Sequence, residues 1–114
     1  MTEVKIEHGT NTVRIKATGH CTHDVCVSVS ALTSALLQYS HMFCEECPGC
    51  SLDKVKYEPG EVDFTVSFDG RERRERYLEG AQSVFSGYEL FAYHFPKDVD
   101  VTVIRNVTPF SESM

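Results

Sequence analysis

Apolar side chains recur at helical spacing in two stretches of the chain. Successive intervals of four, three, four, three and four residues trace one face of an α-helix through Val25, Val29, Leu32, Leu36, Tyr39 and Phe43. The same intervals recur at Tyr77, Ala81, Val84, Tyr88, Phe91 and Phe95. Pro96 favours an end to the second stretch, while Gly80 and Gly87 weaken it, since glycine costs about 1 kcal/mol relative to alanine inside a helix. The pattern predicts two amphipathic helices.

Alternation of apolar and polar positions predicts strands around these helices. The apolar positions of the expected strands lie within 4–8, 13–17, 55–57, 62–68 and 101–103. Residues 9–11 and 58–61 have the composition of hairpin turns between neighbouring strands. Strands with one apolar face and two helices with one apolar stripe each favour a single arrangement. We expect an α+β two-layer sandwich in the order β-β-α-β-β-α-β, with a sheet of about five strands and both helices packed on one face.

Length and composition narrow the class of protein. A chain of 114 residues is large enough for one hydrophobic core, so we expect a single domain over 1–110 and a frayed tail over 111–114. The net charge of −6 argues against direct nucleic-acid binding, which requires many basic side chains. No apolar run approaches the ~20 residues of a membrane span, and the first residues do not form a secretory signal. Five cysteines, an odd number, favour reduced thiols, so we expect a cytoplasmic protein without membrane contact.

A histidine and a cysteine flank the predicted start of the first helix. Asp24 is a preferred N-cap residue, which would place Cys26 near the second helical position. The partial positive charge of a helix N-terminus and a nearby imidazolium from His20 both lower the pKa of a thiol. Cys26 lies in line with Ser30 and Thr33 rather than with the apolar stripe. We therefore expect its side chain on the accessible flank of the core.

The stretch Gly19-His20, a short loop and then residues 24–33 resembles the signature of the ribosomal-processing cysteine protease family. The resemblance implies a catalytic dyad of His20 and Cys26 and no cofactor. It also implies that Gly19 turns the backbone, that Asp24 caps the helix and that Ser30 packs or hydrogen-bonds beneath Cys26. That family removes the N-terminal extension of a large-subunit ribosomal protein, so the expected partners are a ribosomal protein precursor as substrate and a second copy in a homodimer.

Two features depart from that pattern. Five residues separate His20 from Cys26, whereas many relatives carry a longer, glycine-rich loop there. A second cluster, His41, Cys44, Cys47 and Cys50, has spacing compatible with zinc or an iron–sulfur cluster. Free thiols in a loop and reversible disulfide formation are the other interpretations of that cluster. The alternative to a protease is therefore a non-catalytic binding or metal-carrying module on the same fold, using the Cys44–Cys50 loop.

Overall fold

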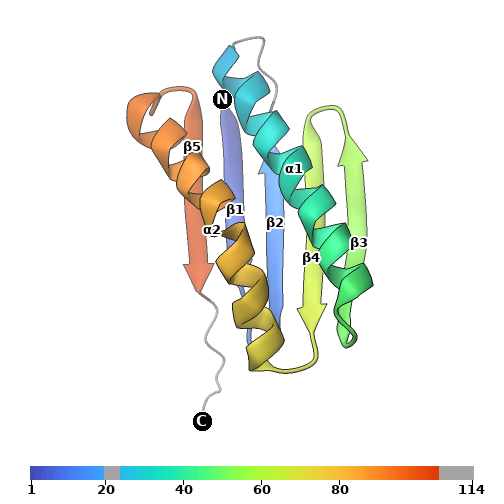
Figure 1. The fold of residues 1–114 in the computed structure, drawn as a ribbon. Helices are drawn as coiled ribbons and strands as arrows, with labels where there is room; N and C mark the ends of the chain where they lie inside the picture. The colour runs from blue at the N-terminus through green and yellow to red at the C-terminus, as the bar shows by residue number, and fades with distance from the viewer. Residues whose placement is uncertain (20–23, 106–114) are drawn as a thin grey trace.

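The computed structural model describes residues 1–19 and 24–105 of the 114-residue chain. Within them, the elements follow the predicted order: β1 (Thr2–His8), β2 (Thr12–Thr18), α1 (Asp24–Glu46), β3 (Cys50–Glu58), β4 (Glu61–Phe68), α2 (Arg71–His94) and β5 (Val99–Arg105). Both helices lie over one face of the sheet (Figure 1), so the predicted two-layer α+β fold is confirmed. The predicted domain end at residue 110 and the tail over 111–114 lie outside the described residues.

The sheet is mixed, with the strand order β3-β4-β2-β1-β5. Hairpin connections pair β1 with β2 and β3 with β4 in antiparallel fashion, and β2 also pairs antiparallel with β4. β5 adds to β1 in parallel, after a crossover through α2. The N-terminal strand is therefore an interior strand of the sheet, with neighbours on both sides.

The covered face of the sheet carries the predicted apolar positions. Alternation along the three central strands puts every second side chain beneath the helices, and six of these side chains are at most 1% exposed: Val4, Ile6, Val13, Ile15, Phe64 and Val66. Burial of such aliphatic and aromatic side chains contributes about 1.5–3 kcal/mol each relative to exposure. The sheet thus forms the rigid base on which α1 is placed.

The buried face of α1 differs from the predicted stripe by part of a turn. Its fully buried line runs through Cys26, Val29, Thr33, Leu36 and Ser40. Four of the six residues of the predicted stripe are only half-buried: Val25, Leu32, Tyr39 and Phe43. The difference has a physical cause, because hydroxyl-bearing side chains occupy the centre of the face.

Two buried hydroxyl pairs explain how polar residues sit at that centre. Thr33 Oγ1 donates to the Val29 carbonyl and lies 2.8 Å from the Tyr88 hydroxyl of α2. Two helical turns further, Ser40 Oγ lies 2.6 Å from the Tyr77 hydroxyl. Each buried hydroxyl therefore has a partner, which removes the cost of desolvating it. These pairs also join α1 to α2.

The glycines of α2 lie where the two helices approach most closely. A Cβ at Gly80 would overlap the hydroxyl of Tyr39, which donates to the Tyr77 carbonyl at 3.0 Å. A Cβ at Gly87 would press on Leu32. Both glycines weaken the intrinsic helix preference of α2, and both leave room for side chains of α1.

The cysteine-rich segment is shorter than the loop that the sequence pattern suggests. Helix α1 continues to Glu46, so that Cys44 is a helical residue, and Cys50 is the first residue of β3. Residues 47–49 alone connect the two elements. The three cysteines therefore belong to the end of a helix, a tight turn and the start of a strand.

Strand β3 contains a bulge that reverses its alternation. The register of β3 on β4 shifts between Asp53 and Lys56, and Lys54 has a positive φ of 54°. Beyond the bulge, Val55 and Tyr57 are 49% and 61% exposed. The predicted third strand is thus present, and Tyr57, which pairs with Val62, lies on the helix-covered side at the edge of the sheet. This places Tyr57 beside the cavity described next.

Candidate active site

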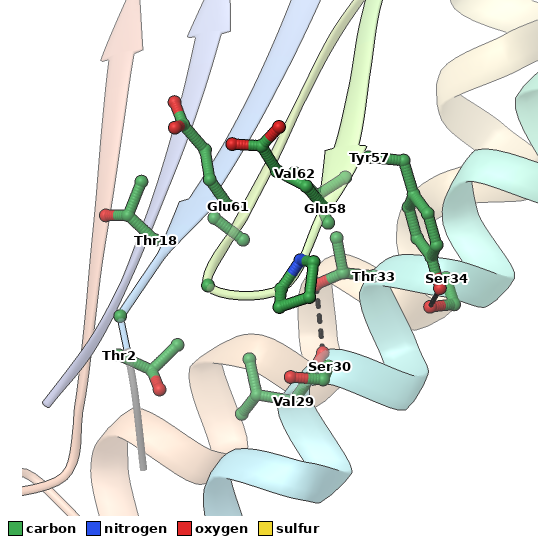
Figure 2. A pocket seen from close by; sticks show the side chains of 14 residues that line it. Thr2, Thr18, Val29, Ser30, Thr33, Ser34, Tyr57, Glu58, Glu61 and Val62 are labelled. Carbon is green, nitrogen blue, oxygen red and sulfur yellow. Dashed lines mark hydrogen bonds between the residues drawn. The ribbon is translucent and has the colours of Figure 1, made fainter.

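A cavity of about 310 Å³ opens beside the N-terminal half of α1 (Figure 2). One wall is formed by α1 through Val29, Ser30, Thr33 and Ser34, and the opposite wall by residues 57–62 of the β3–β4 hairpin. The ends of β1 and β2, residues 2 and 17–19, close the third side. Segments far apart in the sequence therefore meet at one end of the sheet, over the first turns of a helix.

Cys26 lies one helical turn before the cavity wall. Val29 and Ser30 are three and four residues further along α1, a spacing that puts them on the same side of the helix as Cys26. The side chain of Cys26 is only 4% exposed, so the expectation of an accessible position was wrong. The reason is the rotated buried face of α1, which includes Cys26 beside Val29. Cys26 is also disulfide-bonded in this structure, so a thiolate there requires reduction.

The start of α1 provides the electrostatic setting that thiolate chemistry needs. The first backbone N–H groups of a helix have no partner within it, and they carry a partial positive charge. Asp24 is the first residue of α1, one position later than a cap, and position 23 lies outside the described residues. The Asp24 carbonyl accepts a hydrogen bond from Ser28 Oγ at 2.9 Å. Cys26 is the third residue of the helix and so belongs to its first turn.

Gly19 lines the cavity and has the backbone conformation that its predicted role requires. Its φ is +134°, in the region that favours glycine, and a Cβ would overlap the carbonyl oxygen of Met1. Its N–H donates to the Gly60 carbonyl at 3.0 Å, which joins the end of β2 to the β3–β4 turn. The next residue, the predicted base His20, lies outside the described residues.

Ser30 is exposed and lines the cavity. The neighbour with a buried hydroxyl on this side of α1 is Thr33, which bonds to Tyr88. The expectation that Ser30 packs or hydrogen-bonds beneath Cys26 stays a prediction, and its exposed side chain is available to a molecule in the cavity.

Three residues that line the cavity, Tyr57, Glu58 and Glu61, were not predicted as site residues from the sequence, because they come from the distant β3–β4 hairpin. The Tyr57 hydroxyl lies 2.9 Å from Ser34 Oγ and joins the two walls (Figure 2). Glu58 and Glu61 contribute carboxylates, and Lys56 Nζ lies 3.6 and 2.9 Å from them. The Glu58–Glu61 turn was predicted, but its position beside α1 depends on the tertiary fold. The cavity combines an apolar floor with hydroxyls and carboxylates at its rim.

The second cysteine cluster does not assemble a metal site in the part of the chain that the structure describes. Residues 1–19 and 24–105 contain no group of three or more His, Cys, Asp or Glu side chains able to hold a metal ion. The imidazole of His41 instead approaches Glu45 at 3.5 Å on the exposed side of α1. Cys44, Cys47 and Cys50 are free thiols. Partial burial raises the pKa values of Cys44 and Cys50, so both are protonated at neutral pH.

No helix of the described ranges is both long and apolar enough to cross a membrane. No protein-family model matches the chain, and no curated protein sequence matches it at a significant level.

Solved structures share the fold. SMU.848 from Streptococcus mutans superposes with a TM-score of 0.66 at 13% identity, over 93% of this chain and 96% of that one. The essential ribosomal processing protease Prp from S. aureus, in complex with a substrate peptide, superposes with a TM-score of 0.59 at 19% identity, over 90% and 99% of the two chains. Prp with a covalently linked product peptide gives the same TM-score at 15% identity. The chain therefore has the fold of a ribosomal processing protease along nearly its whole length.

Proposed function

We propose that this chain is a cysteine endopeptidase that removes the N-terminal extension of a ribosomal protein precursor, with Cys26 as nucleophile and His20 as its acid–base partner. The observation that carries the proposal is the cavity of about 310 Å³ one helical turn from Cys26, at the N-terminus of α1. The fold shared with Prp, solved with a substrate peptide, supports the same reading. In this proposal the protein acts in the cytoplasm, as a homodimer.

The proposed chemistry uses the geometry of the helix start. The Cys26 thiolate attacks the carbonyl carbon of the scissile peptide bond, and the free N–H groups of the first turn of α1 donate to the oxyanion that forms. His20 protonates the departing amine, and water then hydrolyses the thioester on Cys26. No metal or cofactor enters these steps. The thiolate forms only after reduction of the disulfide at Cys26, so activity requires a reducing solution.

The cavity provides a place for peptide side chains next to the nucleophile. Its walls come from α1 and the β3–β4 hairpin, and the Ser34–Tyr57 hydroxyl pair spans them. The carboxylates of Glu58 and Glu61 suit a basic substrate, since ribosomal proteins carry many Lys and Arg side chains. This arrangement favours an extended peptide between helix and hairpin.

The test is incubation of the reduced protein with the precursor, read by intact mass. Wild-type protein is expected to release the extension, and Cys26→Ala and His20→Ala are each expected to lower the rate by a factor of about 10³ or more. Matched controls are Cys44→Ala and His41→Ala, the same exchanges at the other end of α1, which retain the wild-type rate.

Cleavage that survives Cys26→Ala contradicts the assignment of the nucleophile. Absence of cleavage by folded, reduced wild-type protein contradicts the proposed function itself and favours a non-catalytic binding module on this fold.

A further inference from the structure

Residues Cys47-Pro48-Gly49-Cys50 form a tight turn between α1 and β3. The N–H of Cys50 donates to the carbonyl of Cys47 at 3.2 Å, the i to i+3 bond of a β-turn. Pro48 stands at the second position and Gly49, with a φ of +90°, at the third, which is the arrangement of a type II turn. The Cα atoms at the ends of such a turn lie within about 7 Å of each other.

That separation overlaps the range of about 4.4–6.8 Å between the Cα atoms of a disulfide. The Cys47 thiol donates to the Pro48 carbonyl at 3.9 Å within the turn, and it is close enough to the Cys50 thiol to raise the pKa of Cys50. We propose that Cys47 and Cys50 are a reversible dithiol–disulfide site, oxidised by low-molecular-weight disulfides such as oxidised glutathione. The proposal is independent of the peptidase function, because the site lies at the opposite end of α1 from Cys26.

Contacts from α2 and from the turn that precedes it hold the Cys47–Cys50 turn in this conformation. Arg73 Nε donates to the Pro48 carbonyl at 2.7 Å, and the N–H of Asp69 donates to the Gly49 carbonyl at 2.7 Å. Hydrogen bonds to both central carbonyls fix the turn before any sulfur chemistry takes place. The disulfide therefore closes with little movement of the backbone.

The surroundings of the two thiols indicate which one attacks glutathione first and which one then closes the disulfide. Partial burial and the neighbouring thiols of Cys47 and Cys44 raise the pKa of Cys50 to about 12, although the Arg73 guanidinium acts in the opposite direction. Cys50 is therefore the less reactive thiol toward a reagent in solution. This leaves Cys47 as the attacking sulfur and Cys50 as the resolving sulfur.

The exchange balances in two steps. The Cys47 thiolate attacks one sulfur of oxidised glutathione, which breaks the S–S bond, forms a mixed disulfide and releases one glutathione thiolate. Cys50 then loses its proton to solvent and attacks the Cys47 sulfur, releasing the second glutathione thiolate. The protein loses two electrons and two protons, and oxidised glutathione becomes two molecules of reduced glutathione. Closure is faster at alkaline pH because the resolving thiol must ionise.

The disulfide between Cys47 and Cys50 can be measured from the mass of one proteolytic fragment. A protease that cleaves after glutamate cuts after Glu46 and Glu61, since Pro59 protects the bond after Glu58, and the fragment 47–61 contains two cysteines, Cys47 and Cys50, separated from Cys44. The fully reduced protein is incubated with oxidised glutathione, quenched in acid, digested and weighed. Most of the fragment is expected to be lighter than the dithiol form by two hydrogens, and reduced glutathione in excess is expected to restore the dithiol.

Two variants sharpen the test. In Cys47→Ser the fragment cannot close, and any glutathione attached to Cys50 stays attached. The matched control Cys44→Ser removes a thiol one turn earlier on α1 and is expected to leave closure unchanged. A fragment that remains an open dithiol, that retains glutathione in the wild-type protein, or that is linked to Cys44 overturns the proposal.

Discussion

The two ends of α1 both carry cysteines, and they differ in almost every property that governs sulfur chemistry. At the N-terminal end, Cys26 lies near free helix N–H groups and one turn from a cavity of about 310 Å³. At the C-terminal end, Cys44, Cys47 and Cys50 surround a turn that α2 holds closed. The helix dipole stabilises a thiolate at the first end and opposes one at the second.

The difference shows that the spacing of cysteines alone does not establish a metal site. The Cys44–Cys50 spacing suggests metal ligands, yet the described residues hold no metal-binding group there. Cys26 lies one helical turn from the wall of the cavity. The position of each cysteine relative to the helix ends and to the cavity therefore has to be considered beside its spacing.

The largest effect is expected from Gly19→Ala at the cavity end. A side chain there combines an unfavourable φ of +134° with overlap on the Met1 carbonyl and Thr2 Cα, so the free energy of unfolding should fall by about 4 kcal/mol. Gly70→Ala is the matched control, since Gly70 also has a positive φ, +109°, but only Arg73 lies nearby, at 3.9 Å. It should cost about 2 kcal/mol in urea unfolding. Equal losses at the two glycines would show that the contact with β1 is unimportant.

A smaller effect is expected at the opposite end from Arg73→Gln. Loss of the hydrogen bonds to the Pro48 and Asp69 carbonyls should lower the free energy of unfolding by about 1 kcal/mol and slow closure of the Cys47–Cys50 disulfide. Arg71→Gln, at an 86% exposed side chain, should change stability by less than about 0.5 kcal/mol. Denaturant titration of both variants measures the difference. An equal response would remove the role assigned to Arg73.

Tyr57→Phe separates substrate binding from stability at the cavity. The exposed hydroxyl bonds to Ser34 across the rim, so its removal should change stability by less than about 0.5 kcal/mol. The KM for the precursor should rise about threefold with kcat nearly unchanged, because the pair positions the cavity walls rather than the reacting atoms. Tyr93→Phe, at an 80% exposed tyrosine of α2 outside the cavity, serves as control. A change in KM with Tyr93→Phe as large as with Tyr57→Phe argues against a specific role of the rim.

The smallest effect is expected in the pH dependence of the free energy of unfolding, through His8. This residue ends β1, at the same end of the sheet as the Cys47–Cys50 turn. Burial and the cations of Arg105 and Arg74 lower the pKa of His8 from its usual value of 6.5. Between that lowered pKa and 6.5 the unfolded chain binds more protons than the folded one, so stability is complete above pH 6.5 and falls as the pH decreases below it. Arg105→Gln removes one of the two cations and should weaken this fall. Urea titrations between pH 7.5 and about 5 test the sign, and a stability that rises on acidification would refute it.

Residue patterns predicted the layers and the order of the elements because periodicity reports which face of an element is buried. They misplaced the buried face of α1, since Thr33 and Ser40 count as polar until Tyr88 and Tyr77 provide partners for their hydroxyls. The bulge at Lys54, which turns Val55 outward, left no signal in the alternation. The hydrogen-bond partners of buried hydroxyl groups and the register of β3 on β4 both depend on contacts between segments that are distant in the sequence.

The sequence predicted the residues at the start of α1 that could carry the chemistry, but it did not predict the cavity beside them. The Gly19, Cys26 and Asp24 positions follow from the local pattern, and the structure gives Gly19 its positive φ. The cavity could not be anticipated, because it requires β2, α1 and the β3–β4 turn to converge, and the Gly19–Gly60 bond joins residues about forty positions apart. Cys26 was expected to be accessible and is buried, for the same reason that the helix face was misplaced.

The central claim is that the catalytic thiol is the one at the start of α1. The most direct measurement uses a peptide with the sequence that precedes the cleavage site of the precursor, ending in a chloromethyl ketone, added in limiting amount to the reduced protein. Fragment masses then locate the attached peptide. The account predicts attachment to Cys26, blocked by excess precursor and slowed by His20→Ala. Attachment to Cys44, Cys47 or Cys50 at a comparable rate, unaffected by precursor, would contradict it.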